Sequence, residues 1–271
     1  MGSPRSGAKT LAPCVAAAAL LAAAPARVEA GAWAQPAGQG QVIVSLTDSG
    51  GDHDFLADGR GVAAPPYRKL EGTALVEYGL TGWLTAIAAP DLLSVRTTWP
   101  TSRYDGFGQS GAGIRARIWQ AGSTALSIQA MGYLPGPRRH GDTAQLGYAD
   151  AETDWRLLAG HSFMLGKWSG FTDVELAYRT RAGAPADEVH LDLTLGLRPT
   201  PRVLVMLQSF TTVTYGPAQA PFLPGRWTKL EASVVYDLTP RWSVQLGALT
   251  TVLGVNALHE RGFVAGVWHR F

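Results

Sequence analysis

The chain has 271 residues, of which 46% are hydrophobic and 16% are charged, and it contains one cysteine. A single cysteine excludes a disulfide framework and a cysteine-ligated metal site. The formal charge of +2 belongs to the first 30 residues, which hold three basic residues and one acidic residue. The remainder is formally neutral and gives no indication of a nucleic-acid partner.

Residues 1–30 have the pattern of a secretory signal peptide. Arg5 and Lys9 precede an Ala/Leu run over 15–24, and Val28 and Ala30 provide the small residues of a cleavage site. The run is shorter than the about 20 apolar residues that a membrane-spanning helix needs. We therefore predict a signal peptide over 1–30 and one domain over 31–271.

Period-two alternation of apolar and polar residues follows along the chain and predicts strands. The predicted strands are 40–47, 67–79, 83–96, 108–119, 124–134, 153–164, 169–179, 187–198, 202–215, 227–237, 241–252 and 260–271. In the segment 187–198, leucines alternate with polar residues in a pattern that no soluble helix has. Pro90 interrupts the third segment, and a bulge there could reverse its faces.

The connections alternate in length. Short turns near 80–82, 121–123, 165–167, 199–201 and 238–240 alternate with longer loops near 48–66, 97–107, 135–152, 180–186, 216–226 and 253–259. This asymmetry is typical of transmembrane barrels. We predict an all-β, antiparallel up-and-down transmembrane β-barrel of about 12 strands, with short periplasmic turns and longer external loops. Its predicted location is the outer membrane of a Gram-negative bacterium.

Aromatic residues lie where such a barrel meets the membrane surface. Tyr78, Trp83, Tyr236 and Trp242 flank two short turns, where they would form part of an interfacial girdle. Phe271 ends the last alternating strand, and a terminal aromatic residue there is the signal read by the machinery that assembles outer-membrane barrels. We therefore expect membrane lipid and this assembly machinery as partners.

Two stretches resemble known outer-membrane proteins. Residues 78–83, YGLTGW, resemble turns of bacterial outer-membrane barrels that are described as transporters. Residues 31–36, GAWAQP, followed by 38–44, GQGQVIV, are similar to an alphaproteobacterial family labelled XagA. The resemblance implies an outer-membrane barrel with a link to surface polysaccharide or biofilm, and it implies no particular biochemical activity.

Charged residues collect on the faces opposite the apolar ones, where a barrel has its lumen. They are Lys69, Glu71, Glu77, Arg115, Arg117, Asp154, Arg156, Asp173, Glu175, Arg179, His190, Asp192, Arg198, Lys229, Glu231 and Arg270. Unpaired charges in a narrow lumen are costly, so we expect cross-strand pairs among them. Arg115, Arg117, Arg156 and Arg179 are the candidates for a row that attracts anions.

These features predict a pore or transporter for small hydrophilic solutes. The first alternative is a non-conducting scaffold barrel, in which the same charges plug and stiffen the lumen. The second is an outer-membrane hydrolase. Against it, His161 and Ser162 are adjacent and would point to opposite faces, and His190 and Asp192 share a face without a serine. We expect no enzymatic activity and no cofactor.

Two predicted loops and two tryptophans offer further binding sites. Asp48, Asp52, Asp54 and Asp58 cluster around His53, without the spacing of a calcium loop, so we expect a solvated loop and no metal. Arg138 and Arg139 could contact lipopolysaccharide phosphates. Trp119 and Trp268 are expected to face inward, where either ring could stack on a sugar, although packing in the girdle or lumen is the favoured interpretation.

Overall fold

A computed structural model describes residues 31–136, 144, 150–219 and 221–271. Its strands are β1 (Gly40–Phe55), β2 (Gly61–Gly79), β3 (Leu84–Ala89), β4 (Asp91–Thr98), β5 (Thr101–Phe107), β6 (Ser110–Ala121), β7 (Thr124–Leu134), β8 (Glu152–Leu165), β9 (Trp168–Arg181), β10 (Asp187–Thr200), β11 (Val203–Tyr215), β12 (Arg226–Asp237), β13 (Trp242–Val255), β14 (Ala257–Leu258) and β15 (Arg261–Arg270). Within these residues no helix has both the length and the apolar character needed to cross a membrane.

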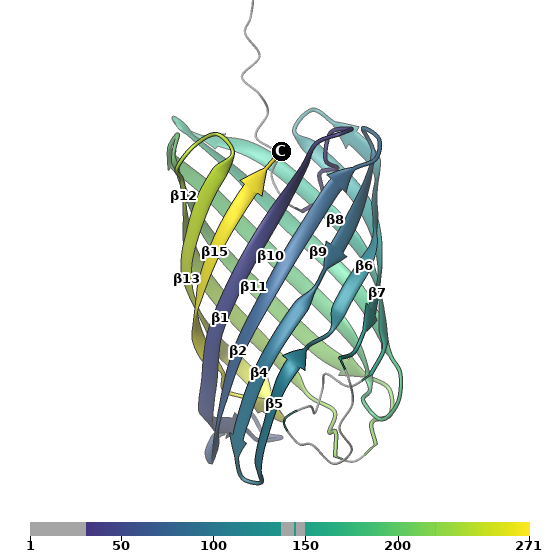
Figure 1. Cartoon of the computed structure of the whole chain (residues 1–271), viewed down its shortest axis with the longest axis vertical. Coiled ribbons are helices and arrows are strands. Elements are labelled where there is room, and N and C mark those ends of the chain that lie inside the picture. Colours follow the sequence, from purple (N-terminus) through teal and green to yellow (C-terminus); the bar gives the residue numbers. More distant parts are fainter. Residues whose placement is uncertain (1–30, 137–143, 145–149, 220) are drawn as a thin grey trace, which may run out of the picture.

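The strands form one antiparallel sheet that closes into a barrel (Figure 1). β1 closes the ring because it pairs with β2 on one side and with β15 on the other. β3 with β4 and β5 with β6 each form one interrupted strand, and β14 is a short strand in a loop. The prediction of an all-β barrel with 12 strands is therefore confirmed.

Pro90 marks the place where the third strand changes partner. On one side of it β3 pairs with β6, and on the other β4 pairs with β5, while β2 pairs with both halves. The faces do not reverse, because the buried side chains of Ile87 and Leu93 lie on the same side of the sheet. The proline thus interrupts the ladder without turning the rest of the strand inside out.

A register shift between Arg117 and Trp119 has a larger effect. It pairs Trp119 with Leu126, which lies on the outer face, and leaves the indole 49% exposed. The expectation that Trp119 faces inward is therefore wrong, because one extra residue in a strand turns the following side chain to the other face. Trp268 does face inward and is 8% exposed.

The outer face carries the apolar side chains that a lipid environment requires. Leu193, Leu246 and Phe263 are among the large apolar residues exposed there. At the end with the short turns, which we call the periplasmic end, the rings of Tyr78 and Phe271 stack with centroids 6.5 Å apart. Backbone bonds between Gly40 and Phe271 close the seam at the same end.

The strands reach further at the opposite, extracellular end than the sequence predicted. The expected loop over 48–66 is largely strand, since β1 and β2 continue to a short connection at 56–60. Arg68 on β2 donates to Asp48 on β1 across this extension. The expected loop over 97–107 is also largely strand, because β4 and β5 form a hairpin there. Cross-strand pairing thus outweighs the weak strand propensity of these segments.

The outer face provides a direct test of the membrane orientation. Leu193→Arg near the middle of β10 should lower the free energy of unfolding by about 2–4 kcal/mol in phospholipid vesicles, because the charge enters hydrocarbon. Leu238→Arg in the β12–β13 turn is the matched control and should lower it by about 0–1 kcal/mol. Urea titration followed by tryptophan fluorescence measures both. Equal effects at the two positions would contradict the placement of Leu193 within the hydrocarbon layer and of Leu238 at its edge.

Candidate functional site in the barrel lumen

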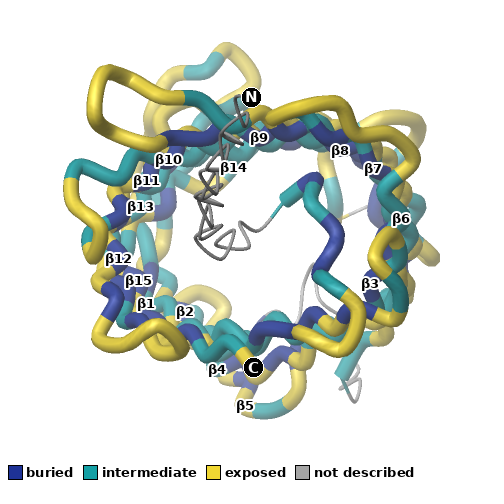
Figure 2. Tube along the Cα trace, turned by 90° about the horizontal axis from the view of Figure 1, so that it is seen from above, coloured by how far each residue is buried: buried dark blue, intermediate teal, exposed yellow. Residues whose placement is uncertain are grey.

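The lumen contains a segment of the chain that the sequence did not predict there. Residues 31–39, which we call the N-terminal segment, precede β1 and run inside the barrel wall (Figure 2). Within it Ala32 is 0% exposed and Gln35 is 1% exposed. The segment lies against inward-facing residues of several strands from β2 to β9, so it occupies part of the passage.

Hydrogen bonds from the wall hold the backbone of this segment. The Ala32 nitrogen donates to Asp173 Oδ1 at 2.8 Å, and the Gln35 nitrogen donates to Thr85 Oγ1 at 2.9 Å. The Ser127 hydroxyl donates to the Ala32 carbonyl. Backbone groups that leave water need such partners, and here side chains of β3, β7 and β9 supply them.

Glu77 on β2 links the N-terminal segment to the charged wall. Its fully buried carboxylate accepts hydrogen bonds from the side-chain amides of Gln35 at 2.8 Å and Gln41 at 2.7 Å. Arg115 Nη1 lies 2.9 Å from the other carboxylate oxygen, and Arg115 Nε donates to Gln129 at 3.0 Å. The Glu77 charge is therefore paired and hydrogen-bonded, as a buried carboxylate requires.

Trp33 is the largest side chain of the N-terminal segment and fits a space left by a glycine. A Cβ atom at Gly160 on β8 would lie 2.5 Å from the Trp33 ring. The indole also meets Phe171 on β9 edge to face, with ring centroids 6.4 Å apart. The absence of a side chain at Gly160 is thus a condition for seating the segment.

The wall formed by β8, β9 and β10 carries a ladder of ion pairs. Arg156 lies 2.7 Å from each of three carboxylates, those of Asp154, Glu175 and Asp192. Arg179 bridges Asp154 and Glu152 at 3.1 and 3.2 Å. One cation thus serves several carboxylates on neighbouring strands, which fixes the relative positions of these side chains.

The ladder continues toward the extracellular end through Arg181. Its guanidinium lies 2.8 Å from both Glu152 and Glu188. Glu188 also contacts His190 Nε2 at 3.0 Å, so this histidine belongs to the ion-pair ladder. His161 lies on an exposed position, where its ring bonds to Thr124 at 2.8 Å, and it does not face the lumen.

Two further clusters of ion pairs lie on the lumen wall, one near each end of the barrel. Near the periplasmic end Arg198 and Arg270 lie 3.0 and 3.7 Å from Asp237. Near the extracellular end Glu260 pairs with Lys229 and, at 3.4 Å, with Lys69. Glu231 lies between them with the amide of Gln245 at 3.4 Å, and it has no cation within 4.0 Å among the residues that the structure describes.

The sequence-predicted arginines do not form a row that is open to anions. Arg115, Arg156 and Arg179 each contact carboxylates, and Arg117 lies at the periplasmic rim with a bond to the Gly82 carbonyl at 2.8 Å. Carboxylates outnumber cations among the described lumen residues. The carboxylates are Glu71, Glu77, Asp91, Glu152, Asp154, Asp173, Glu175, Glu188, Asp192, Glu231, Asp237 and Glu260, and the cations are Lys69, Arg115, Arg156, Arg179, Arg181, Arg198, Lys229 and Arg270. The part of the lumen that the structure describes is therefore acidic.

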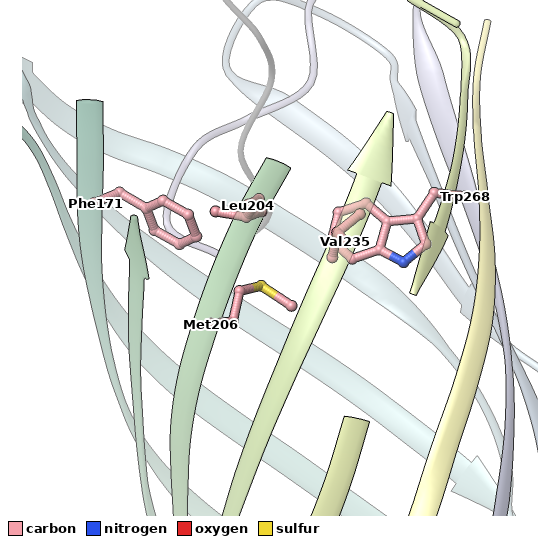
Figure 3. Close-up of a cluster of buried hydrophobic side chains, with 5 residues drawn as sticks. All are labelled: Phe171, Leu204, Met206, Val235 and Trp268. Carbon is pink, nitrogen blue, oxygen red and sulfur yellow. The ribbon is translucent and has the colours of Figure 1, made fainter. Parts of the chain in front are cut away.

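A cavity of about 330 Å³ remains beside the N-terminal segment. One part of its wall is charged, with Asp173, Glu175, Arg198, Glu231 and Arg270. The other part is apolar and is formed largely by Phe171, Leu204, Met206 and Trp268, which pack in one cluster with Val235 (Figure 3). The Trp268 indole packs within this cluster and donates to Gln245 at 2.9 Å, so its ring is largely covered.

Three of the four aspartates in the predicted extracellular cluster are paired, whereas the Oδ1 atom of the fourth, Asp54, has no hydrogen-bond partner among the described residues. Asp48 pairs with Arg68, Asp58 pairs with Arg60, and Asp52 contacts both His53 and Arg261. Across residues 31–136, 144, 150–219 and 221–271 no group of three or more potential ligands could hold a metal ion. The predicted lipopolysaccharide contacts, Arg138 and Arg139, lie outside the described residues.

Solved structures with similar architecture are outer-membrane barrels. An outer membrane channel from Pseudomonas putida F1 is 16% identical with a TM-score of 0.71, over 90% of this chain and 99% of that one. The β domain of the Bordetella autotransporter BrkA is 15% identical with a TM-score of 0.53, over 87% and 100%. The NanC porin is 9% identical with a TM-score of 0.51, over 83% and 98%. No family model and no curated protein matches the chain.

At these identities the likeness shows the fold alone. It agrees with the apolar outer face, and the predictions of an outer-membrane β-barrel and of a location in the bacterial outer membrane are confirmed. The resemblance to the XagA-labelled family is not confirmed and stays a prediction.

The ion-pair ladder predicts a strong dependence on its central cation. Arg156→Met should destabilise the barrel by about 3–5 kcal/mol, because it leaves the carboxylates of Glu175 and Asp192 without their cation in the lumen. Arg103→Met is the matched control, since Arg103 forms an exposed pair with Asp105 that contributes at most about 1 kcal/mol. Denaturant titration of the two variants should separate them clearly, and similar midpoints would show that the ladder contributes little.

Proposed function

We propose that the protein is an outer-membrane channel for small polar solutes, which pass through the lumen beside the N-terminal segment. The observation that supports this proposal best is the cavity of about 330 Å³ that remains in the closed barrel after the segment is seated. A water molecule takes about 30 Å³ in the liquid, so this space suits a molecule of monosaccharide size or smaller.

The composition of the wall supports a preference among such solutes. Carboxylates exceed cations among the described lumen residues, and Asp173, Glu175 and Glu231 line the cavity itself together with Arg198 and Arg270. Rings of acidic side chains favour cations in other pores. We therefore propose cationic or neutral polar solutes in place of the anions that the arginines suggested, and the apolar wall would accommodate a hydrocarbon part of the same molecule.

The competing function is a non-conducting scaffold barrel in the envelope. The N-terminal segment favours it, because the segment and the ion-pair ladder together fill much of the lumen. The link to surface polysaccharide remains a sequence-based proposal, and the size of the cavity favours monomeric solutes over a polymer. Conduction by the folded barrel separates a channel from a scaffold.

Single-channel recording of the folded protein in a planar bilayer tests the proposal. We expect discrete current steps and a reversal potential in a salt gradient that indicates cation preference. Gly160→Val should raise the conductance several-fold, because the new side chain would collide with Trp33 and displace the N-terminal segment.

Gly132→Val is the matched control for this variant. Gly132 lies on the exposed face of β7, and a Cβ atom there meets nothing within 4 Å, so its conductance should equal that of the unmodified protein. If the unmodified protein and Gly160→Val are both silent while heat-modifiable electrophoresis shows folded barrels, the channel proposal fails and the scaffold is favoured.

A further inference from the structure

Asp173 is a buried carboxylate in the lumen that has no cationic side chain beside it. The residue is 4% exposed and lies on β9, facing inward. Among the residues that the structure describes, no lysine, arginine or histidine nitrogen lies within 4.0 Å of it, in contrast with Asp154, which contacts two arginines. An ionised carboxylate without a counter-charge is costly when buried, so a cation placed beside Asp173 would stabilise its charged form.

The first described residue of the chain lies directly against this carboxylate. The Ala32 nitrogen donates to Asp173 Oδ1 at 2.8 Å. A Cβ atom on Gly31 would lie 2.5 Å from the Asp173 carboxyl carbon, so the backbone of Gly31 runs close to the carboxylate. The Gly31 nitrogen is bonded to the Cα atom that would carry this Cβ. No residue with a side chain would fit at position 31 without displacing Asp173.

The predicted cleavage site of the signal peptide ends at Ala30, one bond before that nitrogen. Hydrolysis of the bond between Ala30 and Gly31 places the hydroxyl of water on the Ala30 carbonyl carbon and a proton on the Gly31 nitrogen. The new α-amino group is protonated at neutral pH. The same nitrogen is a neutral amide in the precursor, so processing creates a positive charge where Asp173 lacks one.

We propose that cleavage after Ala30 produces an ion pair between the α-ammonium group of Gly31 and Asp173, and that this pair holds the N-terminal segment in the lumen. Signal-peptide removal and occupation of the lumen are then coupled, because the precursor lacks the cation that seats the segment. The ammonium group also becomes part of the cavity wall, since Gly31 and Asp173 both line the cavity. The proposal does not depend on conduction.

Two measurements on the protein isolated from outer membranes test this proposal. N-terminal sequencing should give Gly31 as the first residue. A water-soluble amine-reactive ester, read by peptide mass spectrometry, should then label the Gly31 amine at least about tenfold more slowly than Lys167, which is exposed in the β8–β9 turn. An ion-paired ammonium is a poor nucleophile, so its protection reports the pair.

Asp173→Asn separates the ion pair from simple burial, because the asparagine can still accept the hydrogen bond from Ala32 while the charge is lost. It should raise the labelling rate of Gly31 to nearly that of Lys167. Asp105→Asn, at an exposed position on β5, is the matched control and should leave the protection intact. In a refolded chain that keeps Ala30, the α-amino group lies on Ala30 and should be labelled nearly as fast as Lys167. Adding Asp173→Asn to this chain should not change that labelling rate.

Either of two results would overturn the proposal. One is a mature chain that begins at another residue. The other is a Gly31 amine whose protection is unchanged in Asp173→Asn, which would assign the protection to burial alone. Heat-modifiable electrophoresis of each variant shows that the barrel is folded, so a loss of protection cannot be mistaken for unfolding.

Discussion

The need to pair every backbone amide and carbonyl within hydrocarbon is the constraint on which the rest of this structure depends. A sheet in a bilayer meets it only by closing, and here the closure is the seam where β1 pairs with β15. Once the ring is closed, alternate side chains of each strand point inward, and the polar residues at these positions line the lumen. The charged lumen is therefore a consequence of the same alternation that makes the outer face apolar.

A lumen built in this way must satisfy its own charges. On β8, β9 and β10 the carboxylates converge on Arg156 and Arg179, and each guanidinium provides several donors in one plane. On β11, β12 and β15 the inward residues include the apolar Leu204, Val235 and Trp268 beside charged residues such as Glu231 and Arg270. The wall of the cavity thus combines charged and apolar side chains, and under the proposed function it would orient a solute that has both a polar and an apolar part.

The sequence predicted most of the fold because the relevant signals are local. Alternation and short turns placed nearly all twelve strands within a few residues, and the inward direction of Asp173 and Arg156 followed from it. Trp119 was misplaced because the register shift beside it leaves no mark in the composition. The ends of β1 and β2 were missed because glycine and aspartate there resemble a loop.

The N-terminal segment could not be predicted, because its partners Asp173 and Ser127 are 141 and 95 residues away in sequence. Gly160 within a strand is an indirect trace of the segment, since the missing side chain leaves space for the Trp33 ring. The segment continues directly into β1, and Gly40 at the start of that strand is held by Phe271 at the other end of the chain. The seam that closes the ring therefore also fixes the end of the segment, while side chains of β3, β7 and β9 hold its backbone inside the lumen.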